Sequence, residues 1–506
     1  MSSTPALIPQ PRQATFTDGE FSLNPDIVIA CASKASAEAE YLADALASQT
    51  GRHPTVVQED VSHSLLLVVD ETQGSWGQED YRLSVTENQV RIVAATSTGV
   101  FYGIQTLLQL VCGSMIPCCA IEDSPKLRWR GLMLDVARHF MPVAFITKLI
   151  DVMALHKLNR LHLHLTDDQG WRLEIEAFPD LAPISSVRSE TLVGHHQQEG
   201  SPRRFDGKPH GGYYRKQEIR DLVAYAASRH ITIVPEIEMP GHCQAVLASF
   251  PAMSCKGGRF EVRRQWGGDK DVYCAGNDDV FTFLETVLDE TLQLFPSEFI
   301  HIGGDECPKD RWKTCPKCQK RIKDEGLADE YELQSWFIRR IERFLSSRGR
   351  RLVGWDEILE GGLPSGATVM SWRGEAGGIA AAKSGHDVVM TPVSHTYFDY
   401  YQGDPKTEPL AIGGFLPLRK AYEYQPIPDV LTQEERRRIL GTQAQLWTEY
   451  MPSPEHVEYM AFPRACALAE VAWGTSDAAN YDGFLTRLSA HLNRLKALGV
   501  NYRPLA

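Results

Sequence analysis

The sequence predicts an α/β protein, a (β/α)8 TIM barrel preceded by a small N-terminal α+β domain. From residue 131 onward, short apolar segments alternate with longer segments whose apolar residues recur at helical spacing, which is typical of a barrel of parallel strands. Before residue 122, strand-like segments are mixed with helical ones, and one stretch alternates like a hairpin. A proline-containing segment, EDSPKLRWRG, separates the two patterns, so we expect domains at residues 1–124 and 125–506.

The N-terminal segment contains short elements of both kinds. We expect strands at DIVIA and SLLLVV, and a helix over residues 35–48, where Ala, Leu and Tyr recur at helical spacing. YRLSVTENQVRIVAA alternates with a period of two and breaks at Glu87 and Asn88, which predicts a hairpin. GVFYGIQTLLQLV is then expected to form a helix.

Eight apolar segments are the expected barrel strands. In chain order they are GLMLDVA, NRLHLHLT, ITIVPEIE, EFIHIGG, RLVGW, ATVMSW, DVVMTPV and GTQAQLW. The clearest helical segments are VAFITKLIDVMALHK, KQEIRDLVAYAASRH, VFTFLETVLDETLQLF, YELQSWFIRRIERFLSSRG and the closing SPEHVEYMAFPRACALAEVAW. The main alternative is a doubly wound open sheet, which is built from the same alternation of strands and helices.

Polar and aromatic side chains follow the C-terminal ends of these predicted strands. They are Arg138, His139, Asp167, Asp168, His242, Asp305, Glu306, Trp355, Trp372, Tyr397, Asp399, Trp447 and Glu449. The C-terminal strand ends of a barrel share one face, so we expect these side chains to converge on a single rim. Carboxylates beside indole rings suit a sugar, because its C–H faces pack on the rings while its hydroxyls bond to charged groups.

FIHIGGDE is the sharpest motif on this rim. Its two glycines allow a tight turn and a close approach to a ligand. Asp305 and Glu306 are adjacent and leave the strand in different directions, so one carboxylate can address a leaving oxygen while the other addresses another part of the sugar. The same pair also fits a plain strand-to-loop turn in which the Asp caps the following helix.

The composition excludes some partners without naming one. Hydrophobic residues make up 43% and charged residues 23%, which is ordinary for a globular protein. A net charge of -13 disfavours nucleic acid and anionic membranes as partners. We find no run of 18 or more apolar residues, so we expect no transmembrane helix. The N-terminal MSSTPALIPQPRQATF has no signal-peptide pattern, which predicts a cytoplasmic protein, although a signal removed beforehand would leave the same appearance.

The cysteine pattern does not predict a disulfide framework. The count of 11 is odd, so we expect mostly free, buried thiols in a reducing compartment. Directly after the GGDE motif comes C-x7-C-x2-C, formed by Cys307, Cys315 and Cys318. A zinc site needs a fourth ligand, for which the candidates are His301, Cys255 and Cys274. Cys255 and Cys274 would instead bridge a loop in an oxidising compartment. We expect no metal and no cofactor.

Seven motifs, taken in order, carry a resemblance to a known family. RGLMLDVARHF, LHLHLTDDQGWR, VPEIEMPGH, HIGGDE, VGWDE, TYFDY and LWTE resemble glycoside hydrolase family 20, the β-N-acetylhexosaminidases. The resemblance runs from about residue 130 to residue 473, and the N-terminal segment looks like the α+β domain that usually precedes this family's barrel. It implies an exo-acting hydrolase that removes terminal β-linked GlcNAc or GalNAc with retention.

The resemblance also implies catalytic roles. The substrate's acetamido oxygen is the nucleophile, and an oxazolinium intermediate forms and is opened by water. Glu306 would protonate the leaving oxygen and then activate that water. Asp305 would accept the acetamido N–H and stabilise the developing positive charge, while Tyr397 would donate its hydroxyl to the acetamido oxygen.

The remaining rim residues would bind or support. Trp355, Trp372 and Trp447 would wall the acetamido group and stack on the ring. Sugar hydroxyls would bind to Arg138, Asp399 and Glu449. Asp167 and His242 resemble a pair behind the acid that holds and tunes Glu306. Arg138 also fits a structural ion pair, His242 a structural hydrogen bonder, and Asp168 is interpreted as structural.

Three other functions fit parts of the pattern. A conventional glycosidase with two side-chain carboxylates would cleave sugars that lack the acetamido group. A non-catalytic sugar-binding barrel would be expected to have lost the acid, yet Glu306 is present. A lacto-N-biosidase-like enzyme, which releases an acetylated disaccharide, would need a wider pocket. The expected partner in each case is a carbohydrate; the sequence gives no indication of the oligomeric state.

Overall fold

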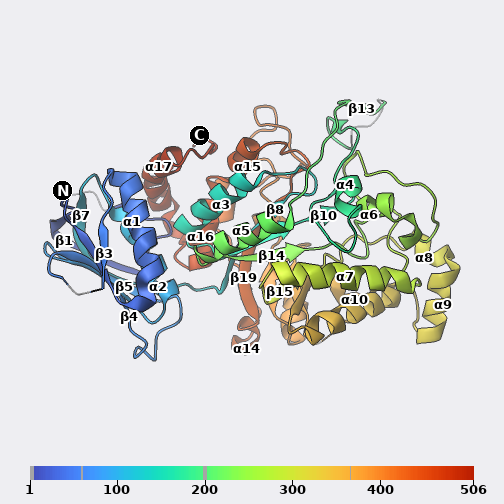
Figure 1. Cartoon of the computed structure of the whole chain (residues 1–506), viewed down its shortest axis with the longest axis horizontal. Helices are drawn as coiled ribbons and strands as arrows, with labels where there is room; N and C mark the ends of the chain where they lie inside the picture. The colour runs from blue at the N-terminus through green and yellow to red at the C-terminus, as the bar shows by residue number, and fades with distance from the viewer. Residues whose placement is uncertain (1–4, 59–60, 198–201, 365, 506) are drawn as a thin grey trace.

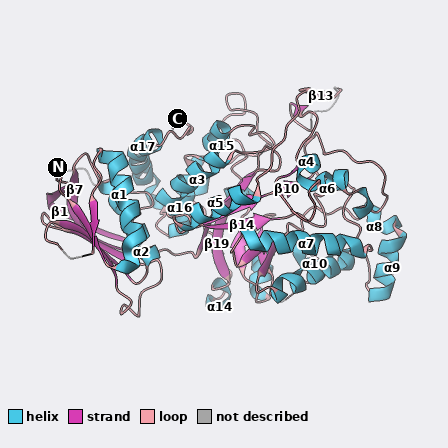
Figure 2. Cartoon of the chain, in the orientation of Figure 1, coloured by secondary structure: helices cyan, strands magenta, loops and turns pink. Residues whose placement is uncertain are grey.

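A mixed β-sheet and a closed β-barrel lie side by side in the computed structural model, which describes residues 5–58, 61–197, 202–364 and 366–505 (Figure 1). The two groups of strands are separate in Figure 2, with the sheet at the N-terminal end of the molecule. Helices cover the barrel, as expected for a barrel whose consecutive parallel strands are joined by helices.

The N-terminal sheet has the strand order β1-β7-β5-β6-β4-β2-β3 within the described residues. Its strands are β1 (Gln13–Ser22), β2 (Val28–Cys31), β3 (Thr55–Val57), β4 (Ser64–Val69), β5 (Tyr81–Val85), β6 (Val90–Ala94) and β7 (Met115–Asp123). Helices α1 (Ser36–Thr50) and α2 (Ser97–Leu110) pack against this sheet and against each other. The predicted strands, hairpin and helices of this segment are all present.

Three strands of this sheet escaped the sequence analysis. The edge strand β1 is almost entirely exposed or half-buried, so its sequence QATFTDGEFS has no apolar face to reveal it. At the opposite edge, β3 has only three residues. In β7, a proline interrupts the alternation of MIPCCAIED.

Eight parallel strands close the barrel in the order β14-β15-β16-β17-β18-β19-β8-β9 within the described residues, which confirms the barrel and excludes the doubly wound alternative. They are β8 (Trp129–Asp135), β9 (Arg160–His164), β14 (Thr232–Glu236), β15 (Phe299–His301), β16 (Arg351–Trp355), β17 (Thr368–Ser371), β18 (Val388–Met390) and β19 (Ile439–Leu446). Each of the eight predicted segments overlaps one of these strands, although β8 and β19 each begin two residues earlier than expected.

The predicted helices are also present. They are α3 (Val143–Leu155), α5 (Lys216–Ala227), α7 (Asp278–Leu294) and α10 (Glu330–Ser347). The closing segment forms two helices, α15 (Pro454–Ala461) and α16 (Arg464–Trp473), because Pro463 cannot continue a helix. A further helix, α17 (Tyr481–Ala497), bridges to the N-terminal part, where Arg494 donates to the carbonyls of Ala6 and Gln109.

The remaining elements are short. They are η1 (Ser33–Ala35), β10 (Thr166–Asp167), β11 (Gly170–Trp171), α4 (Leu181–Ser185), β12 (Leu192–Val193), β13 (Arg204–Phe205), α6 (Gln244–Ser249), η2 (Pro251–Met253), α8 (Asp310–Thr314), α9 (Pro316–Glu325), η3 (Asp356–Leu359), α11 (Ala376–Lys383), α12 (Val393–Thr396), α13 (Leu418–Tyr422), α14 (Gln433–Arg436) and η4 (Ala478–Asn480).

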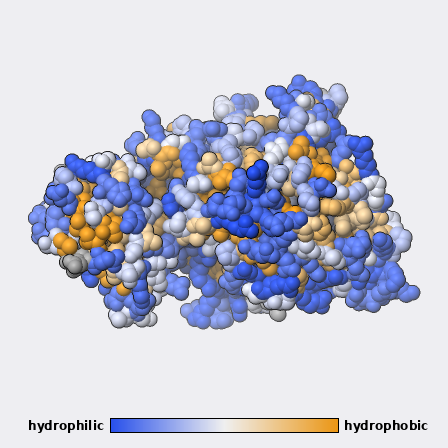
Figure 3. All heavy atoms as spheres, in the orientation of Figure 1, coloured by the Kyte–Doolittle hydropathy of each residue, from blue (hydrophilic) through white to orange (hydrophobic). Residues whose placement is uncertain are grey.

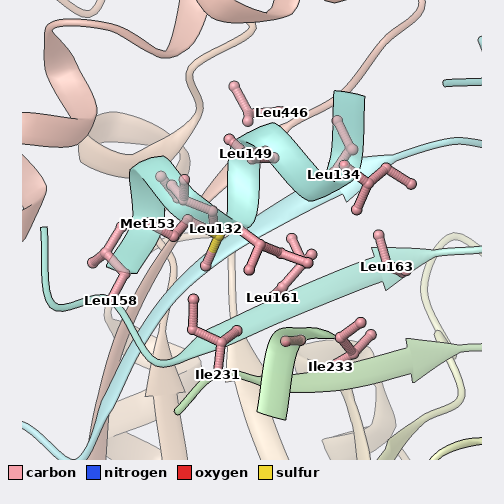
Figure 4. Close-up of a cluster of buried hydrophobic side chains, with 14 of the residues drawn as sticks. Leu132, Leu134, Leu149, Met153, Leu158, Leu161, Leu163, Ile231, Ile233 and Leu446 are labelled. Atoms are coloured by element: carbon pink, nitrogen blue, oxygen red, sulfur yellow. The ribbon is translucent and has the colours of Figure 1, made fainter. Parts of the chain in front are cut away.

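Alternation along the barrel strands separates an apolar layer from a polar interior. Leu161 and Leu163 of β9 belong to the layer of leucine and isoleucine side chains from β8, β9, β14 and α3 that Figure 4 shows. His162 and His164, which alternate with them, are also fully buried but bond to a carboxylate inside the barrel. In the motif LHLHL, the leucines therefore pack in the apolar layer outside the barrel, and the histidines point into its polar interior.

Buried ion pairs join the N-terminal part to the barrel. The ammonium group of Lys157 lies 2.9 Å from Asp123, and both side chains are fully buried. Arg130 of β8 donates two hydrogen bonds to Glu79. These paired charges fix how the two parts meet, because a charge left alone in such a place would be costly.

The outer surface is mainly hydrophilic on the face that Figure 3 shows, with scattered apolar patches. None of the helices in the described residues combines the length and apolarity that a membrane crossing requires.

Candidate active site

All the predicted site residues lie at or just beyond the C-terminal ends of the barrel strands. Asp305 and Glu306 follow β15, His242 follows β14, and Arg138 follows β8. The others lie beyond β9, β17, β18 and β19 or, for Trp355, at the end of β16. The chain thus brings together on one rim side chains that are up to 311 positions apart in the sequence, from Arg138 to Glu449.

The GGDE turn places its two carboxylates in different surroundings. Gly303 and Gly304 have φ angles of 68° and 91°, and Glu306 itself has a φ of 44°, so the backbone turns sharply here. A Cβ atom at Gly303 would overlap the carboxylate of Glu238, which makes glycine the residue that fits. The Glu306 side chain is 56% exposed, whereas that of Asp305 is 14% exposed.

His242 lies between these carboxylates and Asp167. Its Nε2 is 3.7 Å from Asp305 and 3.6 Å from Glu306, while its Nδ1 is 3.4 Å from Asp167. Burial alone would lower the pKa of His242, but the Asp167 carboxylate raises it well above the ordinary value. The Asp167 carboxylate therefore favours the cationic form of an imidazole that lies beside Glu306.

The His242 imidazolium lowers the pKa of both carboxyl groups, yet the two pKa values depart from their ordinary values in opposite directions. The His242 imidazolium, 3.6 Å away, holds the pKa of Glu306 below its usual range. Burial raises the pKa of Asp305 by more than the His242 charge lowers it, so that this pKa lies at about 6. The two neighbouring carboxyl groups thus differ in their affinity for a proton.

Aromatic rings form a continuous wall beside Asp305. Trp372 stacks on Tyr397 with ring centroids 6.2 Å apart, and Tyr397 lies 6.5 Å from Trp447. Trp355 follows at 5.8 Å from Trp447, but it is only 1% exposed and its indole N–H donates to Glu236. Trp355 therefore lies buried beneath the other rings, whereas Trp372 and Trp447 are partly exposed and can contact a ligand.

Arg138 lies on the rim beside the aromatic wall. Its guanidinium lies 2.8 Å from Asp167 and 3.3 Å from Asp135, and it packs over the Trp447 ring. The structural ion pair considered for this residue is thus present. Glu449 also lies within reach of its charge.

Two acceptors on this side have no protein partner. One carboxylate oxygen of Asp399 and one of Glu449 are buried without a hydrogen-bond donor in the described part of the chain. Burial raises the pKa of both groups. Oxygens of this kind are arranged to accept hydrogen bonds from a ligand.

Beside Glu449 the surface is hollowed. A cavity of about 490 Å³ is bounded by His139, Trp266, Tyr450 and Glu449. The rings of Trp266 and Tyr450 lie 6.3 Å apart. Trp266 comes from the loop after β14, which the sequence analysis did not connect with the rim.

A buried charged layer beneath the rim also escaped the sequence analysis. Glu236 contacts three histidines, with 2.7 Å to His301, 3.0 Å to His162 and 2.5 Å to His164. His164 in turn lies 3.0 Å from Asp167. This chain of contacts links the barrel interior to the pair behind Glu306. Histidines alternating with leucines in LHLHL were the available signal.

Glu357 was also missed, although it belongs to the quoted VGWDE motif. Its carboxylate accepts the Trp372 indole N–H at 2.8 Å. Burial and, after it, the charge of Asp305 raise the pKa of Glu357 to about 8. Glu357 thus positions Trp372, and its carboxyl group lies close enough to Asp305 for the two charges to repel each other. Asp168, as expected, has a structural role and accepts the backbone N–H groups of Gln244 and Asp269.

The cysteine analysis requires one correction. All 11 cysteines lie in the described residues, none forms a disulfide there, and nine are buried, as expected. The C-x7-C-x2-C triplet is not a unit, because Cys307 packs beside Gly241 while Cys315 and Cys318 meet two other cysteines. Those partners are Cys255 and Cys274. His301 is no ligand candidate, since it bonds to Glu236.

Family models match almost the whole chain. The model for the catalytic domain of glycosyl hydrolase family 20 matches residues 127–476, and the model for domain 2 of that family matches residues 4–124. The chain is 45% identical to a β-hexosaminidase of Porphyromonas gingivalis over 98% of its own length and 64% of that protein. It is 36% identical to a β-hexosaminidase of Vibrio furnissii, over 92% of this chain and 76% of that one. The chain therefore spans a little under two thirds of the first of these relatives.

Solved structures resemble it over nearly its full length. An exo-β-N-acetylglucosaminidase from Vibrio harveyi, in complex with N-acetylglucosamine, superposes with a TM-score of 0.87 at 32% identity and covers 99% of this chain and 78% of its own. An N-acetyl-β-hexosaminidase from Streptomyces plicatus, in complex with Thio-NAglucal, has a TM-score of 0.82 at 31% identity, with 98% and 96% of the two chains covered.

Proposed function

The chain belongs to glycosyl hydrolase family 20, and from this premise we propose that it is an exo-acting, retaining β-N-acetylhexosaminidase. It removes terminal β-linked GlcNAc or GalNAc from oligosaccharides or glycoconjugates. The observation that carries the proposal is the placement of Asp305 and Glu306 side by side at the end of β15, next to an aromatic wall. The similarity to β-hexosaminidases supports it.

The nucleophile in this proposal is the substrate's own acetamido oxygen. Asp305 accepts the acetamido N–H, and Tyr397 donates its hydroxyl to the acetamido oxygen. Burial and the charge of Asp399 are the main causes of the raised pKa of Tyr397. Asp305 is close enough for its charge to raise that pKa as well. Holding the acetamido group against the anomeric carbon supplies proximity, which is worth several kcal/mol in well-oriented cases. Negative charge on Asp305 stabilises the oxazolinium as it forms.

Glu306 is the proton donor and then the base that activates water. Its side chain is 56% exposed, which leaves the carboxyl group accessible to a leaving group. In the free enzyme His242 lowers its pKa, so the acid form has to be favoured by the substrate. A bound sugar displaces water from around the carboxyl group, and desolvation raises a carboxyl pKa. His242 and Asp167 therefore tune Glu306 and do not themselves react.

The other rim residues bind the terminal sugar. Trp372 and Trp447 supply apolar faces for the ring and the acetamido methyl, above the floor formed by Trp355. The hydroxyls of the terminal sugar bind to the charged groups of Arg138, Asp399 and Glu449. The unpartnered oxygens of Asp399 and Glu449 support this assignment, since they provide acceptors that no protein group uses in the described residues.

The test compares chromogenic substrates side by side. The β-N-acetylglucosaminide and β-N-acetylgalactosaminide should be cleaved, and the plain β-glucoside should resist. Equal cleavage of the glucoside would indicate a side-chain nucleophile and contradict the proposal. A substrate that presents an intact acetylated disaccharide adds a further arm, because its exclusive cleavage would indicate a disaccharide-releasing enzyme. NMR of the first-formed product should show the β anomer.

A thiazoline analogue of the oxazolinium tests the nucleophile directly. It should inhibit competitively, because it presents the ring that the acetamido group forms. An isosteric sugar without the thiazoline ring is the control. Absence of inhibition would argue against participation of the acetamido group.

A further inference from the structure

Four cysteines gather beside the rim, outside the proposed catalytic residues. Cys255 follows η2, and Cys274 lies in the loop before α7. Cys315 and Cys318 form a C-x2-C pair at the start of α9. The cluster therefore joins two stretches of chain, the loop after β14 and the helical segment after β15.

The sulfur atoms are arranged like the corners of a tetrahedron. The Sγ of Cys318 lies 3.7 Å from that of Cys255 and 3.7 Å from that of Cys274, and Cys274 lies 3.7 Å from Cys315. All four Sγ atoms are within 4.8 Å of one another. Four thiolates bound to zinc at about 2.3 Å would have S···S edges of about 3.8 Å. A disulfide, in contrast, joins its sulfurs in pairs at about 2.05 Å.

The local structure favours thiolates at this point. Cys315 is the residue before α9 and Cys318 lies in its first turn, where unpaired backbone N–H groups stabilise negative charge.

The backbone around the cluster is fitted closely. A Cβ atom at Gly276 would overlap the backbone of Lys317 and Cys318, so the loop after Cys274 lies directly against the C-x2-C turn. Cys274, Cys315 and Cys318 are buried, and Cys255 is partly exposed. The cluster is thus buried except at Cys255, the side from which a metal ion can enter.

We propose that Cys255, Cys274, Cys315 and Cys318 bind one structural zinc ion. Thiolate ligands select a soft or borderline metal, and four of them leave no open position for water, so the ion has a structural role rather than a catalytic one. It links the loop that follows His242 to the segment that follows Glu306. The inference is independent of the proposed hydrolysis, because metal content is measured without a substrate.

The experiment uses the full chain, expressed with added zinc and purified under reducing conditions without a chelator. Elemental analysis should give one zinc per chain. Titration with a mercurial in the presence of a chromogenic chelator should release that zinc as four thiols react. Cobalt substituted for zinc should show the thiolate charge-transfer and visible bands of a tetrahedral tetrathiolate site.

Variants assign the ligands. Cys274→Ser and Cys315→Ser should each lose most of the zinc, whereas the control Cys112→Ser, at an exposed thiol outside the cluster, should retain it. If the cluster variants fail to fold, removal of the metal from the unmodified protein gives the same information. The apo protein should then melt several degrees lower and recover when zinc is returned.

Three results would overturn the proposal. The first is a protein without zinc that also fails to take up zinc after reduction. The second is mass spectrometry showing two disulfides among these four cysteines. The third is full zinc content in both Cys→Ser variants. Iron at this position would refute the choice of metal.

Discussion

The His242 imidazole lies 3.6 Å from the Glu306 carboxylate, so the group proposed as the proton donor has a cation beside it before any substrate arrives. That contact holds the pKa of Glu306 low, which is opposite to what an acid requires. The conflict is resolved if a bound sugar removes water from around Glu306, because this desolvation raises the pKa of the carboxyl group and favours its protonated form. Several measurements can separate these contributions.

Glu306→Gln should abolish the hydrolysis of substrates with poor leaving groups and leave the fold intact, because Gln keeps the size of the side chain and loses the proton. The expected loss of kcat is about 100-fold or more, and it should be much smaller for an activated leaving group. Glu434→Gln, on an exposed helix surface, is the matched control. Unchanged activity on poor leaving groups would refute the assignment.

Removal of the His242 cation should raise the pKa of Glu306. His242→Asn is therefore expected to shift the alkaline limb of the pH profile of kcat/KM to higher pH, since Glu306 then holds its proton longer. Asp167→Asn should act in the same direction, because His242 loses the carboxylate that keeps it charged. His53→Asn, at an exposed histidine, is the control. An alkaline limb that stays in place would show that His242 has only a structural role.

Asp305 should govern the acidic limb of activity. With a pKa of about 6, it becomes protonated as pH falls below that value and no longer accepts the acetamido N–H. The limb near pH 6 should disappear in Asp305→Asn, whose kcat should fall far more than its affinity for the substrate. A variant with normal kcat and weakened binding would contradict the proposed role.

The same carboxyl group should lower the stability of the fold at neutral pH. The folded protein holds the Asp305 proton with a pKa of about 6 against an ordinary 3.8, so folding is favoured less as pH rises through this window. The difference amounts to about 3 kcal/mol at most. Asp305→Asn is thus expected to raise Tm at pH 7.5 and to lose this advantage near pH 4. Equal Tm differences at both pH values would argue against the raised pKa.

Trp372 should contribute to substrate binding more than to chemistry. Trp372→Ala is expected to raise KM by roughly 10-fold, since ring stacking is worth about 0.5–1.5 kcal/mol beyond buried area. Trp76→Ala, in the N-terminal part, controls for loss of an indole elsewhere. An unchanged KM for the acetamido substrates would place the sugar away from this ring.

The buried pair of Lys157 and Asp123 should be important for stability. Lys157→Met is expected to cost roughly 3 kcal/mol, because a buried carboxylate loses its cation. Tyr81 and Trp473 still donate hydrogen bonds to Asp123, which limits the loss. Chemical denaturation with Lys34→Met as an exposed control would measure it. A change below about 0.5 kcal/mol, the level of ordinary surface substitutions, would contradict this account.

The barrel was accessible from the sequence because its strands are apolar on the helix-facing side and end in polar residues. The edge strands of the N-terminal sheet could not be predicted from the sequence. Most side chains of β1 are exposed, and β3, with three residues, is too short to show a two-residue alternation. Strand periodicity identifies a buried face, and an edge strand without one resembles a loop.

For the site, the sequence could identify residues at strand ends but not those inside the barrel. Glu236 and His301 sit within strands, where a polar residue usually indicates an exposed face, so their mutual pairing became visible only in the closed barrel. From the sequence, Cys255 and Cys274 were only alternative candidates for a fourth ligand or for a disulfide. They are separated from the C-x2-C pair by α7, β15 and α8, and the nearer Cys307 formed a misleading triplet.

The contact between Gly303 and Glu238 has a consequence for how this turn can vary. Glu238 fills the volume that a side chain at position 303 would need, and the φ of 68° penalises other residues as well. Single replacements of Gly303 should therefore be rejected in a library, while shortening Glu238 first would open space for alanine. Positions 303 and 238 should therefore vary together, because a substitution tolerated at one depends on which residue occupies the other.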